Sequence, residues 1–124
     1  MLNTSTIDRV RVLRFNRPEK RNALTPNMLD RLGREIQEAQ ASRECGAIVL
    51  SGVGDYFSAG FDLSLCNQDP TVLRTLLETL AACCRGIRDG DRCVVVSAHG
   101  AALAGACALA AAADFVVTTR EAKL

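Results

Sequence analysis

The sequence predicts an α/β fold in which helices pack against parallel strands. Residues 47–50 and 93–98 are short apolar runs rich in β-branched residues, which is typical of strands buried on both faces. Stretches with apolar residues at helical spacing precede both runs. Strands and helices that alternate along a chain favour a layered arrangement with parallel neighbouring strands.

The first third of the chain predicts a strand, a polar loop and a helix. Residues 7–15 alternate imperfectly between apolar and charged side chains, which indicates an edge strand with one face in water. Pro18 ends this strand in a polar loop. Thr25 and Pro26 then form the cap and first position of a helix. Its apolar stripe consists of Leu29, Leu32, Ile36 and Ala39.

The remainder predicts two further helices and three further strands around glycine-bearing turns. A loop at residues 51–63 follows the second strand, and Asp69-Pro70 repeats the cap-and-proline signal. The apolar stripe of the next helix is predicted to consist of Leu73, Leu76, Leu77, Leu80, Cys84 and Ile87. After the strand at 93–98, an alanine-rich helix is expected to begin at Gly105, before a last strand at Phe115–Thr118. Few segments remain to cover that helix, so we interpret the chain as part of a larger fold or as one that relies on partners.

Composition argues against several classes of function. The 124 residues include 15 Lys and Arg and 14 Asp and Glu, a net charge of +1 that gives no electrostatic basis for nucleic-acid binding. His99 is the single histidine and none of the six cysteines forms a CxxC pair, so we predict no metal site. The cysteines and the polar start of the chain, which does not resemble a signal peptide, favour a reducing, cytoplasmic location.

Residues 94–113 carry no formal charge over a length that would cross a membrane. Alanine dominates this run, and His99-Gly100 interrupts it near its start. A buried strand followed by a buried helix therefore explains the run better than a membrane span, and we expect no membrane partner.

Two glycine turns, at Gly60 and Gly105, each follow a buried strand. If these strands are neighbours, the turns emerge at one sheet edge, where α/β folds bind ligands, and two backbone N–H groups can converge on one oxygen. The alternative is that the glycines only allow tight turns. We expect Asp62 to orient the adjacent loop or cap a turn, and we favour a turn role for His99 over that of a general base.

Several motifs in order and spacing resemble the crotonase family, also called the enoyl-CoA hydratase/isomerase family. They are Asn16-Arg17-Pro18 with Asn22-Ala23-Leu24, Ala47-Ile48-Val49-Leu50-Ser51-Gly52, Phe57-Ser58-Ala59-Gly60-Phe61-Asp62-Leu63, and residues 100–110 with Asp114. The resemblance implies a spiral of ββα units. Residues 1–124 would form the N-terminal part of this ClpP/crotonase-like domain, apparently truncated, with the C-terminal part absent.

The resemblance also implies an acyl-CoA thioester as substrate, in assemblies of three or six chains. Coenzyme A is then part of the substrate, and no separate cofactor is expected. The backbone N–H groups of Phe61 and Gly105 would hold the thioester oxygen. Residues expected to contact the substrate are Lys20, Arg21, Ala23, Ala59, Asp62, Leu63 and Leu103.

One position departs from the family's hydratases. They carry a glutamate on the first turn of the helix, where this chain has Ala108. Because alanine cannot transfer a proton, we expect isomerisation or a related enolate reaction rather than hydration. The family's other catalytic carboxylate would lie beyond residue 124, so the chain alone is expected to be inactive. The alternative function is a non-catalytic acyl-CoA-binding or assembly module.

Overall fold

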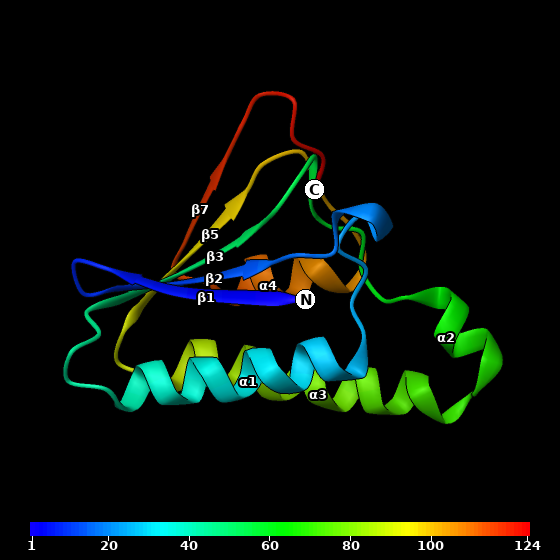
Figure 1. Cartoon of the computed structure of the whole chain (residues 1–124), viewed down its shortest axis with the longest axis horizontal. Coiled ribbons are helices and arrows are strands. Elements are labelled where there is room, and N and C mark those ends of the chain that lie inside the picture. Colours follow the sequence, from blue (N-terminus) through cyan, green and yellow to red (C-terminus); the bar gives the residue numbers. More distant parts are fainter.

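The computed structural model describes residues 1–124 as two β-sheets with helices packed against them (Figure 1). The larger sheet has five strands in the order β1-β2-β3-β5-β7, and β4 pairs with β6 in a second, two-stranded sheet. The strands are β1 (Leu2–Ile7), β2 (Val10–Phe15), β3 (Ala47–Gly52), β4 (Tyr56–Ser58), β5 (Cys93–Ala98), β6 (Ala101–Ala102) and β7 (Phe115–Thr118). The helices are η1 (Pro18–Lys20), α1 (Pro26–Ala41), α2 (Leu63–Gln68), α3 (Thr71–Asp89) and α4 (Gly105–Ala112).

The larger sheet is parallel except at its N-terminal edge. Strands β2, β3, β5 and β7 pair in parallel, whereas β1 and β2 form an antiparallel hairpin. The prediction of one strand over residues 7–15 is wrong, because Asp8 and Arg9 have φ of 47° and 70° and turn the chain back between Ile7 and Val10. The preceding polar residues belong to β1, an edge strand in which only Leu2 is buried. A strand with so little buried surface has no alternating pattern to reveal it.

The smaller sheet makes the chain a spiral. After β3 the chain enters β4, after β5 it enters β6, and after β7 it reaches Lys123, which forms a parallel bridge with Ala101. Each turn of the spiral therefore contributes one strand to the large sheet and one short segment to the small sheet. This arrangement confirms the expected spiral of ββα units. Strand β4 lies within the predicted loop at residues 51–63, whereas α2 and β6 lie in stretches for which the sequence predicts no helix or strand.

Helices α1 and α3 cover one face of the large sheet (Figure 1). Helix α1 starts as predicted, with the Thr25 hydroxyl accepting from Met28 N at 3.1 Å, and its whole predicted stripe is buried. In α3, Leu73 and Leu77 are 44% and 53% exposed, which corrects the predicted stripe. The buried residues of α3 are Leu76, Leu80, Cys83 and Ile87, and the predicted Cys84 is half-buried at the edge of the core. This spacing follows one line along the helix, and Leu73 and Leu77 lie beside that line.

Burial is lowest at the C-terminal edge of the sheet. Strand β7 is exposed along its whole length, including Phe115, Val116 and Val117. An apolar hollow of about 260 Å³ lies beside it, lined by Cys107, Ala110, Ala111, Val116 and Leu124. None of the helices combines the length and the apolarity that a membrane span needs. The uncharged run at residues 94–113 instead folds as β5, β6 and α4.

Candidate active site

The two glycine turns predicted from the sequence lie in contact. Strands β4 and β6 pair in parallel, and Leu103 N donates to Ser58 O at 3.0 Å. Gly60 has φ of +92°, and a Cβ built on it would lie 2.9 Å from Leu103 O and 3.4 Å from Gly105 N. A Cβ on Gly105 would in turn lie 3.1 Å from the Phe61 ring. The turn at Gly60 therefore needs glycine, because its φ is positive and the main chain of the other turn packs directly against it, whereas Gly105 packs against the Phe61 side chain.

Each of the touching turns carries one free hydrogen-bond donor. Neither Phe61 N–H nor Gly105 N–H donates to any acceptor in the chain. Gly105 is the first residue of α4, where helix geometry leaves N–H groups without partners and the helix dipole places partial positive charge. We call Phe61 N–H and Gly105 N–H the donor pair. Such a pair suits an oxygen atom that gains negative charge.

Backbone strain accompanies the second donor. Ala104, directly before Gly105, has φ of 48° and ψ of −122°, a conformation that residues with a Cβ rarely adopt. Strain of this kind persists only where the surrounding structure enforces it, and it clusters at functional sites. Here the pairing of Leu103 with Ser58 on one side and the start of α4 on the other hold the turn.

Replacing Ala104 with glycine is expected to raise the free energy of unfolding by about 1 kcal/mol. The substitution removes backbone strain of about 1–3 kcal/mol from the folded chain. The greater conformational freedom of glycine in the unfolded chain offsets part of this gain in stability. Urea unfolding followed by circular dichroism measures the change. Ala111→Gly, at an exposed position within the same helix, is the matched control and should lose about 1 kcal/mol. Equal destabilisation by both variants would contradict the prediction.

A buried polar network ties the first donor to the loop before α1. Asn22 and Ser58 are both 0% exposed. The Asn22 side chain accepts from Arg17 N at 2.8 Å and donates to Val53 O and Tyr56 O, each at 2.9 Å. The Ser58 hydroxyl donates to Asn22 O at 2.7 Å and accepts from Gly60 N at 3.1 Å. Both residues lie within the sequence motifs described above, and those motifs predict no role for either side chain.

An ion pair between Arg17 and Asp62 also links the loop before α1 to the turn at residues 59–63. Arg17 Nη1 lies 2.8 Å from Asp62 Oδ2 and 3.1 Å from Ala23 O. The other carboxylate oxygen of Asp62 accepts from Ser64 N and Ser64 Oγ, which caps α2. Hydrogen bonds from Ser64 and then the Arg17 guanidinium lower the pKa of Asp62 below its usual 3.8, although burial opposes the shift. Asp62 thus caps a helix and orients the loop, as the sequence predicted.

Because its pKa is lower in the folded chain, Asp62 stabilises the fold fully above about pH 3.8, and this contribution disappears as pH falls through the folded pKa. We expect Asp62→Asn to reduce the free energy of unfolding at pH 7 by about 1.5–3 kcal/mol, the range for a hydrogen bond to a charged group. The difference from the wild type should shrink as the pH is lowered below 3.8. Urea unfolding at a series of pH values between 7 and 2 measures it. A difference that is independent of pH would show that the charge of Asp62 contributes nothing.

The residues expected to contact the substrate lie in the segments around the donor pair. The loop at residues 20–24 joins residues 59–62 through Ala59 N to Arg21 O at 2.9 Å, Leu24 N to Gly60 O at 2.7 Å and Asp62 N to Leu24 O at 3.0 Å. Lys20 and Arg21 are exposed, and the Arg21 guanidinium lies 5.7 Å from the centre of the Tyr56 ring. Leu63 and Leu103 are exposed as well. This places two basic side chains and two exposed leucines around the donor pair.

His99 and Ala108 lie on either side of the Gly105 turn along the chain. The His99 Nε2 atom contacts Gly54 O, so the imidazole links the turn after β5 to the loop after β3, in agreement with the predicted turn role. Ala108 lies in the first turn of α4 and packs against the core. Asp62 is the only acidic residue within the turns at 59–63 and 103–108, and both of its carboxylate oxygens already have partners.

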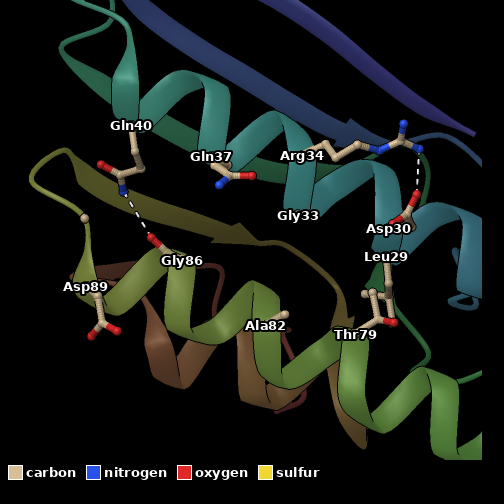
Figure 2. Close-up of a pocket in the computed structure, with 11 residues that line it drawn as sticks. Leu29, Asp30, Gly33, Arg34, Gln37, Gln40, Thr79, Ala82, Gly86 and Asp89 are labelled. Atoms are coloured by element: carbon tan, nitrogen blue, oxygen red, sulfur yellow. Dashed lines mark hydrogen bonds and ion pairs between the residues drawn. The ribbon is translucent and has the colours of Figure 1, made fainter.

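The largest hollow of the chain lies elsewhere. It has a volume of about 480 Å³ and runs between α1 and α3 (Figure 2). Gly33, Ala82 and Gly86 let the helices approach, and Gln40 Nε2 donates across to Gly86 O at 3.4 Å. The hollow shares no residue with the turns that carry the donor pair. We therefore assign the candidate site from the two unpaired backbone N–H groups on the touching turns and not from cavity size.

Comparison with known proteins identifies the family of this chain. A family model described as enoyl-CoA hydratase/isomerase matches residues 6–124. The chain is 30% identical over 123 residues to 2,3-dehydroadipyl-CoA hydratase of Escherichia coli, covering 98% of this chain and 48% of that protein. It is 28% identical over 131 residues to the mitochondrial Delta(3,5)-Delta(2,4)-dienoyl-CoA isomerase of Rattus norvegicus, covering 96% of this chain and 40% of the isomerase.

A solved structure supports the fold. The human enoyl coenzyme A hydratase domain-containing protein 3 superposes with a TM-score of 0.91 at 27% identity, covering 98% of this chain and 49% of the human one. The chain spans about half the length of the curated relatives it matches. On the family match and the shared spiral of strands and helices, this chain belongs to the enoyl-CoA hydratase/isomerase, or crotonase, family.

Proposed function

We propose that a protein containing this chain processes acyl-CoA thioesters through an enolate that the donor pair stabilises. The observation that carries the proposal is that Phe61 N–H and Gly105 N–H lie on touching turns and have no acceptor within the chain. The family's hydratases and isomerases named above act on CoA thioesters, as their names state. The donor pair then forms the oxyanion hole expected from the sequence.

The chemistry follows from where charge develops. Removal of a proton from the carbon next to the thioester carbonyl leaves an electron pair that moves onto the carbonyl oxygen. Two N–H groups that already point at this oxygen stabilise the enolate more than the neutral thioester, and this difference accelerates the reaction. Each such donor is worth about 2.7–4 kcal/mol of barrier. Lys20 and Arg21, exposed beside the site, are suited to the phosphates of coenzyme A.

Within this chemistry we propose isomerisation, or a related enolate reaction, in preference to hydration. The methyl group of Ala108 occupies the place of the glutamate in the family's hydratases, and a methyl group neither activates water nor protonates carbon. Both carboxylate oxygens of Asp62 are held by Arg17 and Ser64, so this residue does not replace the missing acid or base.

The same observation favours a second candidate function. A chain with a donor pair and without a free carboxylate beside it can bind an acyl-CoA thioester and leave it unchanged. This second candidate is the non-catalytic acyl-CoA-binding or assembly module considered from the sequence.

Calorimetry with the 124-residue chain and a medium-chain acyl-CoA tests the proposal. We expect binding of the thioester that is tighter than binding of free coenzyme A, because only the thioester offers a carbonyl oxygen to the donor pair. Assays of double-bond migration and of hydration in a full-length protein separate the candidates: migration supports the isomerase-like reaction, and binding without turnover supports the module. Equal affinity for coenzyme A and its thioester would contradict a role for the donor pair.

A further inference from the structure

We infer that Leu24, Ser58 and Asn22 act as positioning residues that hold Phe61 N–H in the direction the thioester oxygen requires. The functional part of this inference rests on the proposed function; its geometric part concerns the chain alone. The four segments involved are residues 22–24, Tyr56–Ser58, residues 60–62 and residues 103–105. Only hydrogen bonds and packing between them set the direction of the donor.

The main chain of Leu24 determines which way Phe61 N–H points. Leu24 N donates to Gly60 O at 2.7 Å and Leu24 O accepts from Asp62 N at 3.0 Å, so Leu24 pairs with the groups on both sides of Phe61. In a trans peptide the C=O and N–H point in opposite directions. Since Gly60 C=O points at Leu24, the N–H of the same peptide, which belongs to Phe61, points away from Leu24.

The second turn also packs against residue 60. A Cβ on Gly60 would lie between Leu103 O and Gly105 N, at 2.9 Å and 3.4 Å. The pairing with Leu24 therefore leaves Phe61 N–H free on the side away from residue 24, next to the turn that supplies Gly105 N–H. Leu24 itself is 0% exposed, which keeps water from competing for these two hydrogen bonds.

Ser58 and Asn22 fix the position of residues 22–24 relative to residues 60–62. The Ser58 hydroxyl bridges Asn22 O and Gly60 N, so it links the segment that contains Leu24 to the residue before Phe61. Asn22 is fixed in turn through its side chain to Val53 O and Tyr56 O. Without these contacts, only the two main-chain hydrogen bonds of Leu24 would oppose rotation of the peptide between Gly60 and Phe61, because Gly60 tolerates many conformations.

Residual dipolar couplings of the ¹⁵N-labelled chain test the geometry directly, since they report the direction of each N–H bond. In the wild type we expect the Phe61 and Gly105 couplings to agree with the N–H directions in the structure. In Ser58→Ala the Phe61 coupling should shrink or change sign, the Gly60 amide should lose its protection from hydrogen exchange, and the couplings of β3 and β5 should stay unchanged. An unchanged Phe61 coupling in this variant overturns the inference.

Ser51→Ala is the matched control, because Ser51 is also a buried serine whose hydroxyl accepts one side-chain hydrogen bond, from Arg14 Nε at 2.9 Å. It should leave the Phe61 coupling as in the wild type, and an equal change in both variants overturns the inference. If Ser58→Ala does not fold, Ser58→Cys keeps a weaker donor of similar size. This variant should shift the Phe61 coupling by a smaller amount, and no shift at all overturns the inference.

A second measurement connects the direction of Phe61 N–H to the proposed function. It also distinguishes failure of the proposed function from failure of the positioning inference. The infrared carbonyl band of a bound acyl-CoA labelled with ¹³C at the thioester should move to lower frequency on binding to the wild type, and by less than half as much in Ser58→Ala. In a full-length protein, Ser58→Ala should lower kcat at least tenfold with KM within about threefold. A wild type that binds no acyl-CoA defeats the proposed function, while the couplings still decide the positioning of Phe61.

Discussion

Replacement of Gly105 by proline is expected to lower kcat for an acyl-CoA substrate by about 100- to 1,000-fold in a full-length protein that carries this chain. Proline has no N–H, so the substitution removes one member of the donor pair. Proline is common at the first position of a helix and Gly105 N–H has no partner within the chain to lose, so only Ala104, whose ψ is −122°, must adjust to the following proline. The loss should therefore appear in turnover, with little change in the circular dichroism spectrum.

Gly105→Ala is the control for the added side chain. Its Cβ would lie 3.1 Å from the Phe61 ring, a close contact that proline shares, but alanine keeps the N–H. We expect a loss in kcat of less than about tenfold, because only a shift of the ring is needed. If proline and alanine at position 105 lower kcat equally, the N–H of this residue has no part in the reaction.

Replacement of Gly100 by alanine should have the largest effect on stability. Gly100 lies between β5 and β6 with φ of +72°, and a Cβ at this position would overlap the main-chain oxygen of Asp55. Gly100 O also accepts from Lys123 N at 2.7 Å, so the residue joins three segments of the spiral. Because a backbone atom cannot move aside as a side chain can, we expect a loss of more than about 4 kcal/mol and no cooperative thermal transition.

Gly33→Ala is the matched substitution at a glycine that packing does not require. In α1 the added methyl group would meet only Cys83 Sγ, at 3.5 Å, which is an ordinary contact. Alanine is the better helix former, so we expect this variant to gain about 0.5–1 kcal/mol and a higher melting temperature. A cooperative transition of wild-type stability in Gly100→Ala would show that the β5–β6 turn forms differently from the structure described.

Some parts of the fold follow from local sequence. Thr25-Pro26 predicts the start of α1, the apolar stripe of that helix predicts its buried face, and the β-branched run before Ala98 predicts β5. These signals are local because a helix cap or a strand face depends on residues within a few positions of one another. Strands β4 and β6 have three and two residues, too few to carry a period, and they exist only through pairing with each other.

The stripe of α3 shows where local patterns stop being sufficient. Leucines at 73, 76, 77 and 80 are equally apolar, and the sequence does not say which of them face the sheet. Packing against α1 and α4 selects Leu76, Leu80 and Cys83 and leaves Leu73 and Leu77 exposed. Burial is a property of the partner surface as well as of the side chain.

For this chain, the sequence alone determined the class of layers, the buried faces of α1 and β5, the family motifs and the two glycine turns that carry the donor pair. Tertiary structure decided that these turns touch, and that Leu24, Ser58 and Asn22 hold Phe61 N–H in place. The physical reason is distance along the chain. Residues 22, 58 and 104 are far apart in sequence, and hydrogen bonds between such segments form only once the spiral of strands has placed them side by side.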